Sequence, residues 1–189
     1  MYDSFVFLYP HTAYFDTNEG NLCTNRPDTD LETIRQYFRD QVSRARSQSS
    51  LTTLIVVKQE NGELNEISPL IGQSPDDILL PTNVAGTGLD APTRNSDYEK
   101  LSRMITGQNI LLGGFHLQDC VFQLALELFA QDRQVDIAML TTDFFYDLLS
   151  LPDHAPKTID PLSHPIPLPE FLRHFKERIK RIWDVELAV

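Results

Sequence analysis

Short apolar runs alternate with longer amphipathic stretches along the 189-residue chain. Each run is rich in aliphatic, β-branched and aromatic residues and is nearly continuous in apolar character, as is typical of parallel strands buried on both faces. We therefore predict strands at residues 4–9, 51–58, 76–81, 109–114 and 135–140, with a sixth at 184–189.

The stretches between these runs carry helix start signals. Thr29-Asp30-Leu31-Glu32 and Ser96-Asp97-Tyr98-Glu99 have capping-box spacing before an apolar stripe. We expect a further helix from about residue 118 and a last one from near Pro169, a favoured first-turn residue.

This alternation predicts an α/β fold, a three-layer sandwich around a central, mostly parallel sheet of about six strands. The length suits one domain over residues 1–189. Two segments interrupt the rhythm. Residues 62–94 predict a long excursion over the sheet, and residues 152–169 predict a proline-rich connector within the domain.

Composition and charge narrow the setting. Hydrophobic residues make up 41% and charged residues 23% of the chain, which are ordinary globular values. A net charge of −11, with 16 basic against 27 acidic residues, argues against general nucleic-acid binding. The apolar runs are too short to cross a bilayer. With two widely separated cysteines, Cys23 and Cys120, we predict a cytoplasmic, reduced protein that binds neither nucleic acid nor membrane.

Cys120 is the first candidate for chemistry. Ligands of open parallel sheets bind beyond the carboxyl ends of the strands, and Cys120 follows the run 109–114 at the predicted start of a helix. Free amides and the dipole of a first helical turn favour a thiolate and could hold an oxyanion. The alternative is a buried cysteine that acts only as a small apolar residue.

The stretch Gly114-Phe115-His116-Leu117-Gln118-Asp119-Cys120-Val121, followed by Ala125, resembles the nucleophile motif of the isochorismatase-like cysteine hydrolases. The resemblance implies hydrolysis of C–N or C–O bonds in small molecules by an Asp, Lys and Cys triad, and it implies a homo-oligomer. The chain departs from the triad at two places. Pro10 or Tyr9 stands where the aspartate is expected, and Pro81, Thr82 and Asn83 stand where the lysine is expected.

Three interpretations follow. In the first, Cys120 attacks an amide or ester carbonyl, backbone amides from Leu117 to Cys120 hold the oxyanion, and His11 or His116 replaces the missing base. In the second, the domain is catalytically impaired and binds a small molecule or a protein. In the third, it is an unrelated α/β domain.

Other site expectations complete the sequence-based picture. The alternative for His11 and His116 is that each is a turn residue with no role in catalysis. We predict no metal and no cofactor, and the predicted substrate-binding residues are Tyr9, Phe15, Thr82, Asn83, Leu117 and Asp119.

Overall fold

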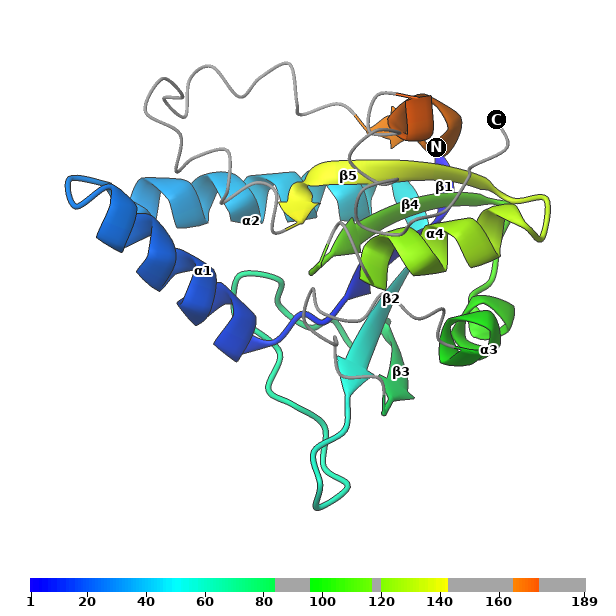
Figure 1. Cartoon of the computed structure of the whole chain (residues 1–189), viewed down its shortest axis with the longest axis horizontal. Coiled ribbons are helices and arrows are strands. Elements are labelled where there is room, and N and C mark those ends of the chain that lie inside the picture. The colour runs from blue at the N-terminus through cyan, green and yellow to red at the C-terminus, as the bar shows by residue number, and fades with distance from the viewer. Residues whose placement is uncertain (84–95, 117–119, 143–164, 174–189) are drawn as a thin grey trace.

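A single six-stranded sheet organises the computed structural model (Figure 1), which describes residues 1–83, 96–116, 120–142 and 165–173. The strand order is β3-β2-β1-β4-β5-β6. The first five strands pair in parallel, and only β6 is antiparallel, on the edge of β5. The strands are β1 (Tyr2–Leu8), β2 (Ser49–Val57), β3 (Ile78–Thr82), β4 (Asn109–Gly114), β5 (Gln134–Thr142) and β6 (Ile166–Pro167).

Strand β1 shows why the central strands read as continuous apolar runs. Successive side chains of a strand point to opposite faces. Phe5 and Phe7 accordingly pack into the core on one face of the sheet, and Val6 and Leu8 pack into the core on the other. Both faces are buried, so no polar position interrupts the run.

Helices cover both faces and make the three layers (Figure 1). On the Phe5 face lie α1 (Thr12–Asn25) and α2 (Leu31–Ser47). On the Val6 face lie α3 (Ser96–Met104), α4 (Phe122–Phe129) and the helical residues 168–173. The prediction of an α/β fold with a mostly parallel sheet of about six strands is confirmed.

Several boundaries also follow the sequence signals. Helix α2 begins one residue later than the capping-box spacing from Thr29 predicted, because Asp30 is the N-cap and its carboxylate accepts hydrogen bonds from the amides of Glu32 and Thr33. The helix expected near Pro169 is present from residue 168. The sixth strand is Ile166–Pro167; the predicted strand at 184–189 lies outside the described residues, as do 152–164 of the proline-rich connector.

Helix α1 was not predicted, because only Phe15, Glu19 and Leu22 are buried along its 14 residues. That is too few for an apolar stripe. The helix is instead held by an ion pair between helices, in which the Arg35 guanidinium donates to both carboxylate oxygens of Glu19. Within the described residues, no helix is long and apolar enough to span a membrane.

The carboxyl ends of β1 and β4 approach each other closely at Leu8 and Gly114, which are register partners. Gly114 has a φ of 127°, a backbone conformation that residues with a side chain rarely adopt. A Cβ atom at this position would collide with the backbone nitrogen, oxygen and Cα of Leu8. The Phe115 amide then donates to the Leu8 carbonyl over 3.2 Å. This contact brings together the segments that follow the two strands.

We predict that Gly114→Ala lowers the free energy of unfolding by roughly 2 kcal/mol or more, because the backbone of Leu8 has no room to yield. Urea denaturation followed by circular dichroism measures the change. Gly20→Ala is the matched control, since Gly20 lies in α1 with nothing within 4 Å of an added Cβ; it should be neutral or stabilise by up to about 1 kcal/mol. Equal stability of Gly114→Ala and the natural protein would contradict this account of the contact.

Candidate functional site

The candidate site lies at the carboxyl edge of the sheet, where β1 and β4 end side by side. Tyr9 and His11 follow β1, and Phe115 and His116 follow β4. Cys120 lies directly before α4, and residues 120 and 121 are already helical. The predicted position of Cys120, at the start of a helix after a strand, therefore agrees with the structure.

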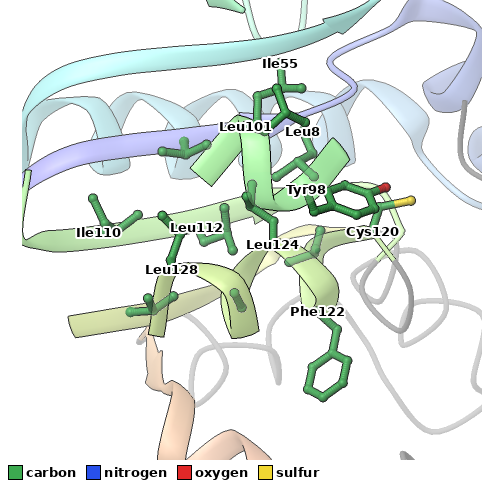
Figure 2. Packing of buried hydrophobic residues seen from close by; sticks show 14 of the residues in the cluster. Leu8, Ile55, Tyr98, Leu101, Ile110, Leu112, Cys120, Phe122, Leu124 and Leu128 are labelled. Carbon is green, nitrogen blue, oxygen red and sulfur yellow. The ribbon is translucent and has the colours of Figure 1, made fainter. Parts of the chain in front are cut away.

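Cys120 is buried, with 1% of its surface exposed, in the apolar core between the sheet and α4. Its side chain hydrogen-bonds the hydroxyl of Tyr9, which also lies 2.9 Å from the hydroxyl of Tyr98 on α3. Figure 2 shows the Tyr98 hydroxyl and the Cys120 sulfur at the same end of this core. Two phenols and one thiol thus form a small polar cluster inside apolar packing.

Tyr9 is completely buried. Burial raises the pKa of its phenol far above the usual value, and the adjacent Cys120 and Tyr98 raise it further. The phenol therefore stays protonated at neutral pH and cannot take a proton from Cys120. Tyr9 was predicted to line a substrate pocket, but its phenol lies beside the Cys120 sulfur.

His11 has a structural partner. Its Nε2 atom accepts the backbone amide hydrogen of Val57, at the end of β2, over 3.1 Å. Burial lowers the pKa of His11 to about 4, so the ring is neutral at pH 7. The nitrogen that could act as a base is committed to Val57, and His11 is not available to Cys120 in this arrangement.

Tyr14, in the first turn of α1, joins the two histidines, and the sequence did not single it out. Its ring is stacked on His11, with centroids 5.4 Å apart and an interplanar angle of 20°. It also meets the edge of the His116 ring at 5.1 Å and 81°. Tyr14 and His116 are both partly exposed. Only the sheet pairing brings these rings together, since they come from separate turns.

His116 is tied to the start of the next helix. The peptide bond between Phe115 and His116 is cis. The carbonyl of His116 accepts the amide hydrogen of Val121 over 3.1 Å. The histidine is therefore held close to the helical turn that carries Cys120.

Phe15 does not line the site. It is buried against the edges of the Phe38 and Phe115 rings, with centroid distances of 5.2 and 4.8 Å. Its prediction as a substrate-binding residue is corrected here: the ring belongs to the core between α1, α2 and the sheet. Phe15 lies in α1, on the buried side of that helix.

The other predicted binding residues lie apart from Cys120 or outside the description. Thr82 is buried at the end of β3, and Asn83 follows it at the surface. In the sheet, β2 separates β3 from β1. Leu117 and Asp119 lie outside the described residues. Among the residues that are described, no three or more histidine, cysteine or acidic side chains are grouped so that they could hold a metal.

Comparisons with known proteins give a distant fold likeness. No family model and no curated protein matches the chain. Three similar solved structures each have 12% identity to it over 98% of its length. Two are named "putative Mar1 ribonuclease", from Leishmania major (TM-score 0.44, 93% of that chain covered) and from Leishmania donovani (0.45, 92%). The third is a hypothetical protein from Trypanosoma cruzi (0.44, 93%).

These comparisons overturn the resemblance to the isochorismatase-like cysteine hydrolases. No family model matches the chain, the model of those hydrolases included. The one specific part of the resemblance was the spacing from Gly114 to Cys120 in a strand-turn-helix unit. Such a unit recurs in α/β folds of many functions, so the spacing alone did not identify a family.

The burial of His11 predicts a pH dependence of stability. Because the pKa of His11 is about 4 in the folded chain and about 6.5 when unfolded, the unfolded chain binds more protons between these values. Stability from the neutral ring is complete above pH 6.5 and falls as the pH drops toward 4. We expect this loss to be of the order of 2 kcal/mol.

The measurement is urea denaturation at a series of pH values from 7.5 to 4.0. The control is His11→Gln, whose amide oxygen can accept the Val57 amide without titrating. We expect a flatter pH profile for this variant than for the natural protein. Parallel profiles would show that His11 is not held neutral by the fold.

Proposed function

We propose that this domain binds a small molecule at the carboxyl edge of its sheet without hydrolysing it, and that Cys120 is a buried structural residue. One observation carries the proposal: Tyr9 occupies the space beside the Cys120 sulfur, with its hydroxyl bonded to both Cys120 and Tyr98. A carbonyl substrate would need that space.

The protonation chemistry supports the same conclusion. A general base contributes about 10²–10⁴-fold to such reactions, and a cysteine needs one because only a few per cent of a free thiol is ionised at pH 7. Tyr9 stays protonated, and the acceptor nitrogen of His11 holds the Val57 amide. Neither can deprotonate Cys120.

Binding is supported by the place and the chemistry of the neighbouring rings. The carboxyl edge is where open parallel sheets hold their ligands. There, the partly exposed rings of Tyr14 and His116 stand nearly perpendicular to each other. Such a corner suits a small planar aromatic molecule, which could stack on one ring and meet the edge of the other.

A second candidate is a cysteine hydrolase of small amides or esters in which His116 is the base. The bond between the Val121 amide and the His116 carbonyl favours it, because this bond holds His116 near the helical turn of Cys120. In this case Cys120 would attack the carbonyl carbon and its proton would pass to the imidazole. The imidazole would then give that proton to the departing amine or alcohol as the C–N or C–O bond breaks, and water would hydrolyse the thioester that is left.

Hydrolysis of p-nitrophenyl acetate and of acetanilide separates the two candidates. We expect no turnover that depends on Cys120, so the natural protein and Cys120→Ser should give the same slow background rate. Turnover that is lost in both Cys120→Ser and His116→Gln would overturn the proposal and establish the hydrolase.

Binding is tested by saturation-transfer NMR with phenol, indole and benzamide as probes. We expect Tyr14→Ala to weaken binding about five-fold, the equivalent of roughly 1 kcal/mol for one aromatic contact. Phe129→Ala is the control. Phe129 is an exposed ring at the C-terminal end of α4, away from the carboxyl edge. Equal loss in both variants, or no saturation transfer to any probe, would contradict an aromatic site at Tyr14.

A further inference from the structure

Tyr9 combines complete burial with an unfavourable backbone conformation. Its φ is 55°, in the left-handed region, although it carries a bulky side chain. Such a conformation is costly for a bulky residue and persists only where surrounding contacts enforce it. The backbone of Tyr9 would therefore adopt a different conformation, with a negative φ, if these contacts were released.

The hydrogen bonds that hold the Tyr9 side chain come from the helical layer formed by α3 and α4. Its hydroxyl is bonded to Tyr98 on α3 and to Cys120 before α4. Its ring also contacts the rings of His11 and Tyr14 in tilted arrangements, at centroid distances of 5.9 and 6.1 Å. One phenol therefore lies between these two helices and the turn that follows β1, next to the sulfur.

Tyr9 also lies just beyond the ladder of the central strands. The last register pairs of β1 are Leu8 with Ile55 and Leu8 with Gly114. Past them, the Tyr9 amide donates to the Ile55 carbonyl over 2.9 Å. Turning the Tyr9 side chain outward would leave all the β1 pairs in place, so the movement can be local.

We propose that Tyr9 is a displaceable plug, and that the space it fills is a cryptic site for a phenol-sized aromatic ligand carrying a hydroxyl. The aromatic ring of the ligand would take the place of the Tyr9 ring in the apolar core. The hydroxyl of the ligand would take the place of the Tyr9 hydroxyl beside Tyr98 and Cys120. Leaving the core lets Tyr9 give up its left-handed backbone. This inference rests on the proposed function, small-molecule binding, and adds a second place and a ligand class to it.

The urea dependence of Cys120 labelling tests the plug in an otherwise natural protein. Cys23→Ser removes the other thiol, and a small maleimide then reports exposure of Cys120. We expect a labelling rate that hardly changes with urea below the unfolding transition, as for a local opening. If the free energy of opening obtained from the labelling rate falls with urea as steeply as the free energy of global unfolding, the proposal is overturned.

The variant Tyr98→Phe, made in the same Cys23→Ser protein, removes the hydroxyl that is hydrogen-bonded to Tyr9 and keeps the ring. We expect labelling of Cys120 to become faster by about five-fold, as for the loss of one net hydrogen bond. An unchanged rate would show that the hydroxyl pair does not hold Tyr9 in place.

The ligand class is tested with p-cresol, whose structure matches the tyrosine side chain. Tyr9→Gly empties the site, and glycine adopts a φ of 55° without strain; Tyr9→Asn is the second variant, because asparagine also tolerates this region. We expect p-cresol to slow Cys120 labelling in the folded variants. Undiminished labelling at saturating p-cresol would overturn the cryptic site.

This readout is independent of the proposed aromatic corner. Protection of Cys120 by p-cresol should persist when Tyr14→Ala is added, whereas binding at the corner should not. Loss of protection in the Tyr14→Ala double variant would assign the ligand to the corner and overturn the cryptic site.

Discussion

The contact between Leu8 and Gly114 is the constraint on which the candidate site depends. Two parallel strands can end this close together only because Gly114 has no Cβ and adopts a φ of 127°. The turns after β1 and β4 consequently leave the sheet side by side. That proximity places the Tyr9 phenol next to Cys120 and brings Tyr14 against His116. Both proposed sites therefore depend on one backbone approach.

Burial then determines what these residues can do. A thiol at the start of a helix has the electrostatics of a nucleophile, but Cys120 is surrounded by apolar side chains and lies beside the protonated phenol of Tyr9. The nearest histidine after β1, His11, serves the backbone of Val57. The two residues after β1 that could have served as a base, Tyr9 and His11, are thus both engaged in other contacts.

The sequence predicted the elements whose pattern is local. Strands β1, β2, β4 and β5 were visible because residues on both faces of each are buried, and α2 was visible through its apolar stripe. The edge strand β3 is buried only at Leu80 and Thr82 and was visible as a short apolar run. Helix α1 was missed because an ion pair between Glu19 and Arg35 takes the place of an apolar stripe. Strand β6 has two residues and no local signal. The family resemblance failed because one spacing is shared by many strand-turn-helix units.

The amino-acid sequence by itself determined the class of fold, the mostly parallel sheet and the position of Cys120 before a helix, because periodicity and capping are short-range properties. Only the tertiary structure decided the roles of the side chains. It turned Phe15 into the core, gave His11 a backbone partner and set Tyr9 beside the sulfur. These outcomes depend on contacts between strands and helices far apart in the chain, and hydrophobic periodicity carries no information about such contacts.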